Sequence, residues 1–185
     1  MRILVFALVL FCLACPARAM TVEEAYKAIP HTRTVFDPEQ ANMARSNALY
    51  LEKFFALTDE ALRNRVEALM RLSTGKGGIS IAEYNKRHEK TVKALAELTP
   101  SAEVAPAYNI IVEAIGEQAD FLNAWARAEP KKREWIKLNF RNDPFVQSSH
   151  DKLIKGYMTL LRAFPFEGGQ NRQAFYDYLC ALDFI

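Results

Sequence analysis

The sequence predicts an all-α protein, an antiparallel helical bundle of about five to seven helices. Apolar residues recur at steps of three and four along most of the 185-residue chain, as on the buried side of amphipathic helices. No segment of convincing length alternates between apolar and polar residues, as half-buried strands do. The connectors between the periodic segments are short, which favours antiparallel neighbours.

The first 19 residues have the pattern of a secretory signal peptide. Arg2 precedes an apolar run over residues 3–15, and residues 17–19 (Ala-Arg-Ala) provide small side chains at the spacing of a cleavage site. The run is shorter than the roughly 20 residues of a membrane span. We therefore expect residues 20–185 to form a single domain without an integral membrane segment once the signal peptide is cleaved. The alternative is that the run forms a buried first helix of the domain.

Cleavage would change both the charge and the cysteine content. Loss of Arg2 and Arg18 lowers the number of Lys and Arg residues from 24 to 22, which equals the 22 Asp and Glu residues. This balance argues against nucleic-acid binding, which requires a concentrated basic face. Only Cys180 remains, and we interpret it as a buried, inert thiol. Acylation of Cys15, as in a lipoprotein, is disfavoured because Cys12 stands where a leucine is expected.

The absence of a possible intramolecular disulfide and of an Asn-x-Ser/Thr sequon favours the periplasm of a bacterium as the destination. Secretion from the cell is the alternative.

The part of the mature chain before the glycine-rich residues 75–78 predicts two or three helices. Residues 21–24 (TVEE) have capping-box spacing and open a short first helix. Asp37 and Pro38 are expected as the N-cap and first position of the next helical segment. Its apolar stripe continues to the glycine-rich residues 75–78, and we expect a kink or break near Thr58 to divide it into two helices.

Two further helices are expected after the glycine-rich break. Ser80 and Glu83 form a second capping box, and Thr99-Pro100 ends the helix that it opens. Residues 107–128 have the longest clear pattern in the chain and are predicted to form the central helix. Its apolar stripe consists of Tyr108, Ile111, Val112, Ile115, Ala119, Leu122, Trp125 and Ala126.

The C-terminal part predicts a short helical segment and two longer helices. The segment over residues 131–142 is expected to present Trp135, Ile136 and Phe140. Asp143 and Pro144 are expected to cap the next helix. Its predicted stripe is Phe145, Ser149, Leu153, Tyr157, Leu160 and Phe164, and that of the last helix is Phe175, Tyr178, Leu179 and Leu182.

Aromatic residues are concentrated in the C-terminal half, where 12 of the 21 follow residue 120. They either pack the bundle or line a pocket for a small apolar ligand or a groove for a partner. The candidate binding residues are Trp125, Trp135, Tyr157, Phe164, Phe166 and Arg172. Three consecutive cations, Lys131 to Arg133, are expected to compensate the dipole of the central helix. Contact with an anionic surface such as lipid headgroups is the alternative.

His88 and His150 are the candidates for metal or haem binding. His88 lies within an apolar stripe and His150 at the edge of one, so a structural role is the simpler interpretation. The chain lacks the spacings that build haem attachment sites, zinc-protease sites and di-iron sites, and it lacks a nucleophile elbow. The sequence therefore predicts a non-catalytic, exported binding protein for an unidentified protein partner or small apolar ligand, without a cofactor. The alternative is a metal- or haem-binding bundle, with any enzyme activity built around these two histidines.

Overall fold

The computed structural model describes residues 33–184, and the regular secondary structure of this part of the chain is helical, without a strand. Its elements, in order, are α2 (Arg45–Thr74), α3 (Ile81–Glu97), α4 (Ala105–Arg127), α5 (Pro130–Asn139), the 3-10 helix η1 (Phe140–Asn142), α6 (Pro144–Ala163) and α7 (Gly169–Leu182). The all-α prediction is confirmed for these residues. The predicted signal peptide and the helix expected to begin at residues 21–24 lie outside them.

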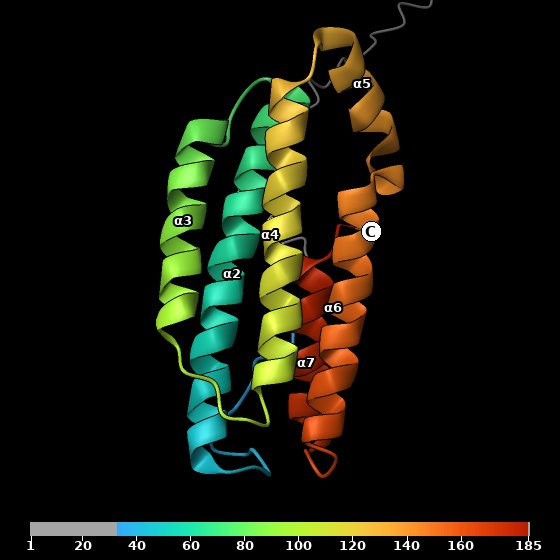
Figure 1. Ribbon diagram of the computed structural model, residues 1–185. Coiled ribbons are helices and arrows are strands. Elements are labelled where there is room, and N and C mark those ends of the chain that lie inside the picture. Colours follow the sequence, from blue (N-terminus) through green and yellow to red (C-terminus); the bar gives the residue numbers. More distant parts are fainter. Residues whose placement is uncertain (1–32, 185) are drawn as a thin grey trace, which may run out of the picture.

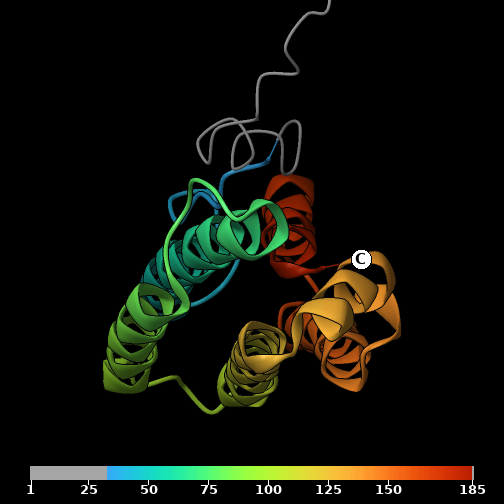
Figure 2. The ribbon, with the colours of Figure 1, turned by 90° about the horizontal axis from the view of Figure 1, so that it is seen from above.

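The long helices run side by side and alternate in direction (Figure 1). Helix α4 contacts α2, α3 and α6, and its packing against α6 is the most extensive in the fold. Helix α7 packs against α6 and α2. Viewed along the helices, α3 and α6 lie on opposite sides of α4 (Figure 2). The short helix α5 joins the end of α4 to the start of α6 at one end of the molecule (Figure 1).

The prediction of a helix break near Thr58 is wrong, because α2 is continuous over 30 residues. The Thr58 side chain is buried, and its hydroxyl donates a hydrogen bond of 2.8 Å to the carbonyl oxygen of Phe55 in the preceding turn. A threonine that bonds back to its own helix does not cap a new one.

The predicted helix start at Asp37 and Pro38 is also wrong. Helix α2 begins only at Arg45. The carboxylate of Asp37 accepts a hydrogen bond from the backbone of Glu39, which closes a turn. The backbone amide and carbonyl of Asp37 both bind the side-chain amide of Asn171, each at 2.9 Å, so this segment is fixed by α7 and not by a helix of its own.

Other predicted helix ends are confirmed. The Ser80 hydroxyl accepts a hydrogen bond from the backbone of Glu83, and the Asp143 carboxylate accepts one from the backbone of Phe145. Gly75 ends α2 with a φ of 71°. At Gly78, also at positive φ, an added Cβ atom would lie 2.0 Å from the carbonyl oxygen of Glu67, so the glycine-rich loop folds back closely on α2.

The predicted apolar stripe of α6 is correct in part. Ser149, Leu153, Leu160 and Phe164 are buried as predicted, whereas Phe145 is exposed and Tyr157 is half-buried. Val146 and Gly156 are buried in addition. Gly156 belongs to this face because α6 approaches α4 closely there: an added Cβ atom would lie 2.6 Å from Cγ1 of Ile111. A sequence pattern that counts only apolar side chains does not include such a glycine.

A buried arginine joins three helices at the end of α7. Arg65 of α2 is only 3% exposed. Its guanidinium donates hydrogen bonds to the last backbone carbonyls of the α7 segment, those of Ala181, Leu182 and Asp183. It also binds the side-chain oxygen of Gln118 on α4. Burial lowers the pKa of Arg65 to about 10, so the group stays charged at neutral pH.

Gly156→Ala should lower the free energy of unfolding by about 1–3 kcal/mol, because the added methyl group overpacks the α4–α6 contact. Gly116→Ala on α4 is the matched control, since its Cβ atom would meet nothing within 4 Å. The control should be about 0.5–1 kcal/mol more stable than the wild type, as alanine favours helices. Urea unfolding followed by circular dichroism measures both, and equal effects would contradict the close approach.

Arg65→Met should lower the free energy of unfolding by about 3–5 kcal/mol, because the buried carbonyls at the end of α7 lose their charged donor. Lys53→Met, at an exposed position of the same helix, should change it by less than about 0.5 kcal/mol. Thermal unfolding of the two variants beside the wild type is the measurement. A small effect at Arg65 would mean that other groups can satisfy these carbonyls.

Candidate functional site

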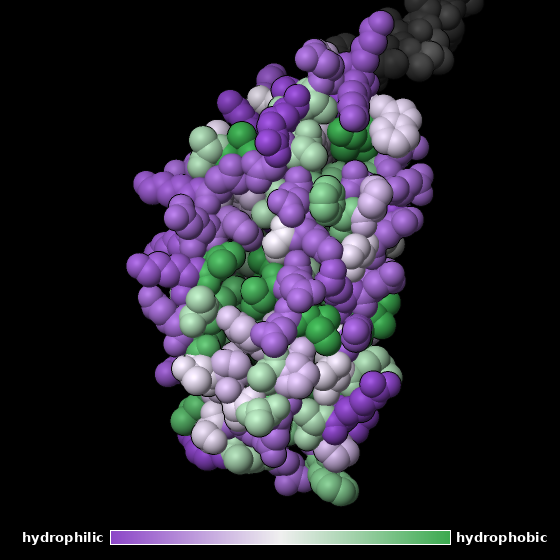
Figure 3. Space-filling model, in the orientation of Figure 1, coloured by the Kyte–Doolittle hydropathy of each residue, from purple (hydrophilic) through white to green (hydrophobic). Residues whose placement is uncertain are grey.

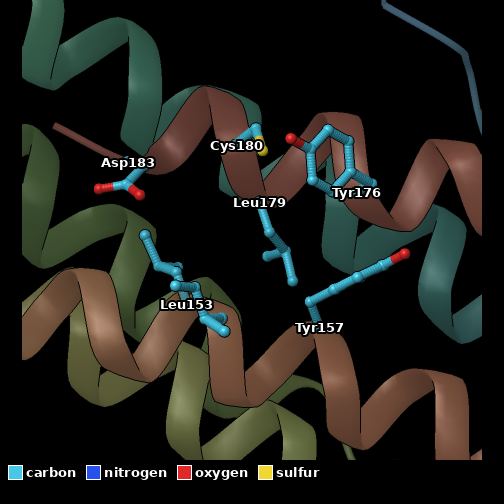
Figure 4. Close-up of a pocket in the computed structure, with 7 residues that line it drawn as sticks. Leu153, Tyr157, Tyr176, Leu179, Cys180 and Asp183 are labelled. Carbon is cyan, nitrogen blue, oxygen red and sulfur yellow. The ribbon is translucent and has the colours of Figure 1, made fainter. Parts of the chain in front are cut away.

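A shallow apolar groove lies between α6 and α7 (Figure 4). It is lined by Leu153, Ile154 and Tyr157 of α6 and by Tyr176, Leu179, Cys180 and Asp183 of the α7 segment. Its volume is about 40 Å³. Pockets for drug-sized ligands measure about 300–1,000 Å³, so this groove has room for one side chain or a similarly small group.

Exposed apolar side chains surround the groove. Ile154 is 50% exposed and Tyr176 is 48% exposed. Met158, one turn beyond Ile154 on α6, is also exposed. Tyr157 and Tyr176 meet across the two helices edge to face, with ring centroids 5.6 Å apart. Apolar residues gathered in this way favour contact with another molecule over contact with water.

The prediction that Cys180 is buried is wrong, because its side chain is exposed at the groove. Helix α7 directs Tyr178, Leu179 and Leu182 into the core, and Cys180 falls outside this buried face. Partial burial raises the pKa of the thiol, the Tyr176 hydroxyl beside it (Figure 4) lowers it, and the carboxylates of Asp177 and Asp183 raise it. A thiol with a raised pKa is protonated at neutral pH and is a poor nucleophile.

The six candidate binding residues do not form one site. Trp125 and Phe164 are buried in the core, and Trp135 and Phe166 are exposed. Arg172 is exposed, and its guanidinium makes a long hydrogen bond of 3.4 Å to the carbonyl oxygen of Pro165. Tyr157 alone among the six lines the α6/α7 groove.

The two histidines have separate surroundings. His88 of α3 stacks on Tyr84, with ring centroids 5.7 Å apart. Burial lowers its pKa, and the carboxylate of Asp120 partly offsets this. Nδ1 of His150 on α6 lies 2.5 Å from Oδ2 of Asp183. Within residues 33–184, no group of three or more His, Cys, Asp or Glu side chains is placed to hold a metal ion.

Buried polar residues near and on α7 were missed by the sequence analysis. The Glu167 carboxylate accepts a hydrogen bond of 3.0 Å from the backbone of Asn42, and that of Asp177 accepts one of 2.7 Å from the backbone of Thr34. With Asn171, they attach residues 33–44 to the bundle. The only sequence signal is polar residues within an otherwise apolar helix, and it does not reveal that their partners lie more than 120 residues earlier in the chain.

Two larger hollows are lined by polar and apolar surface in similar shares and are open to solvent. One, of about 360 Å³, lies between α2 and α3, where Arg87 forms ion pairs with Glu83 and Glu67. The other, of about 460 Å³, lies between the end of α2 and α5 and includes Trp125 and Lys137. The indole nitrogen of Trp125 has no hydrogen-bond partner, but it is inaccessible to solvent and so does not face a ligand in this hollow.

Comparisons of the chain with models of protein families, with curated proteins and with solved structures found no match. Among residues 33–184, no helix is both long enough and apolar enough to cross a membrane.

The lowered pKa of His88 predicts a specific pH dependence of stability. The folded protein binds the His88 proton less tightly than the unfolded chain does. The contribution of neutral His88 to the free energy of unfolding is therefore complete above a pH of about 6.5, and it is lost as the pH falls through the lowered folded pKa. His88→Leu should preserve the fold. As the pH falls from about 7.5 to about 5, the free energy of unfolding of this variant should rise relative to that of the wild type. Urea unfolding of both proteins across this range is the measurement. Parallel pH profiles would show that the imidazole is not desolvated.

Proposed function

We propose that the protein is an exported, non-catalytic binding protein that uses the α6/α7 groove to hold a side chain of a protein partner. The observation that carries this proposal is the shallow groove of about 40 Å³ with Ile154 and Tyr176 half-exposed at its edge. Its small volume favours a partner's side chain over a whole apolar ligand. Export rests on the signal-peptide pattern of residues 1–19.

The groove offers recognition chemistry and little reaction chemistry. Leucine, isoleucine and tyrosine side chains make up most of its lining and provide apolar contact area and hydroxyl groups. The Cys180 thiol has a raised pKa. His150 and Asp183 pair with each other, and no serine, threonine or lysine lines the groove beside them. This arrangement supports binding through shape and apolar contact.

Site-specific photo-crosslinking tests the proposal in the cell that produces the protein. A photoreactive phenylalanine analogue at position 158, next to the groove, should yield a discrete crosslinked species. Ile154→Glu should reduce this species at least about tenfold, because a carboxylate in an apolar contact must be desolvated. Phe166→Glu is the matched control and should leave the yield unchanged, because Phe166 is exposed away from the groove.

Two further readouts complete the test. The partner should slow alkylation of Cys180, since the thiol lies in the groove. Mass spectrometry of the purified protein should give a mature chain that begins at Met20. Crosslinking that is insensitive to Ile154→Glu, or a stoichiometric metal or haem adduct on the purified protein, would contradict a binding role through this groove.

A further inference from the structure

Helix α5 presents an exposed apolar pair at one end of the molecule. Trp135 is 59% exposed and Leu138 is 80% exposed. Three residues apart on a helix, they share one face. Ile136 is buried on the other side and holds α5 against the bundle. The apolar pair is therefore fixed in an outward direction on a short helix that packs on the core.

Cations outnumber carboxylates near this pair in the sequence. The segment over residues 130–142 contains Lys131, Lys132, Arg133, Lys137 and Arg141 and a single carboxylate, that of Glu134. The chain as a whole has 24 cationic and 22 anionic residues, so this segment concentrates positive charge. At the α5 end of the face shown in Figure 3, hydrophilic side chains lie beside hydrophobic and intermediate ones.

Within residues 33–184, Arg133 is the one cation of these five that makes a hydrogen bond or salt bridge. The guanidinium of Arg133 donates hydrogen bonds to the carbonyl oxygens of Ala126 and Ala128, at 2.6 and 2.7 Å, and thereby caps α4. This confirms the predicted dipole compensation for Arg133 alone. The salt bridges found within residues 33–184 include none of Lys131, Lys132, Lys137 and Arg141, which are all exposed.

We propose that α5 is a membrane-surface anchor that docks the protein on an anionic lipid bilayer, with Trp135 and Leu138 among the headgroups and the four exposed cations beside lipid phosphates. Tryptophan is enriched at the membrane interface because its ring is apolar and its N–H group is polar. Exposed apolar residues bordered by Lys and Arg bind anionic bilayers through both apolar burial and charge. The anionic bilayer is opposite in charge to residues 130–142. The proposed anchor is separate from the α6/α7 groove.

Vesicle binding tests this anchor with the mature protein. The chain has two tryptophans, and Trp125 is already buried at 4% exposure, so a blue shift of the fluorescence reports Trp135. Vesicles of phosphatidylcholine with phosphatidylglycerol should cause the shift and sediment the protein. Vesicles of phosphatidylcholine alone should do neither, and salt should weaken the binding because it screens exposed charges.

Matched variants locate the binding surface. Lys131→Glu combined with Lys137→Glu should weaken binding to the anionic vesicles at least about tenfold, since each basic residue near the surface contributes about fivefold. Trp135→Ser combined with Leu138→Ser should weaken it at least about tenfold, through loss of apolar burial. Lys86→Glu combined with Lys93→Glu, two exposed positions on α3, makes the same change of net charge and should have little effect.

Three results would overturn the anchor. They are absence of binding to the anionic vesicles, binding that is equal on neutral vesicles, and an equal loss of binding in the α3 control. If the protein does not bind the anionic vesicles, an acidic protein is the partner that the exposed cations and the apolar pair would fit. All three leave the groove proposal untouched, because the variants lie outside the groove.

Discussion

The end of α7 depends on the charge of Arg65. Helix ends leave several carbonyl groups without partners inside the helix. Here the last carbonyls of α7 point into the core, where water does not satisfy them, and the guanidinium supplies several donors at once. Gln118 donates a second hydrogen bond of 2.6 Å to the carbonyl oxygen of Leu182, and the Phe184 ring lies over the guanidinium at 4.5 Å. Because Arg65 is on α2 and Gln118 is on α4, these contacts fix where α7 ends relative to both helices.

The start of α7 is fixed by a second polar cluster, and the groove follows from both. Asn171 binds the backbone of Asp37, and Glu167 binds that of Asn42, so residues before α2 lie against the other end of α7. Between its two fixed ends, α7 packs Phe175 and Tyr178 against Phe55 of α2. This leaves the opposite side of α7, with Tyr176 and Cys180, facing α6 and solvent. The apolar groove is thus positioned by polar contacts elsewhere on the same helix.

Local interactions decided which features the sequence could predict. The caps at Ser80 and Asp143 involve partners two or three residues away, so their spacing was sufficient evidence. Asp37 has the same local pattern as Asp143, but its backbone is bound by Asn171, and that distant contact prevents a helix. Arg65 has no signal in the sequence, because an arginine on a helix is ordinarily exposed. The exposure of Cys180 was unpredictable for a related reason: it depends on the rotation of α7 about its axis, which its two ends determine.

Helix α6 connects the two proposed contact surfaces, the α5 anchor and the α6/α7 groove. Helix α6 begins next to α5 and runs away from that end of the bundle (Figure 1). Leu153 in the groove is nine residues after Pro144, which corresponds to about 14 Å along the helix at 1.5 Å per residue. A molecule docked through α5 would therefore hold its groove above the lipid surface and accessible from solvent. Binding to a bilayer and binding to a protein partner are sterically compatible in this arrangement, so a protein held at a membrane surface through α5 could recruit its partner there through α6 and α7.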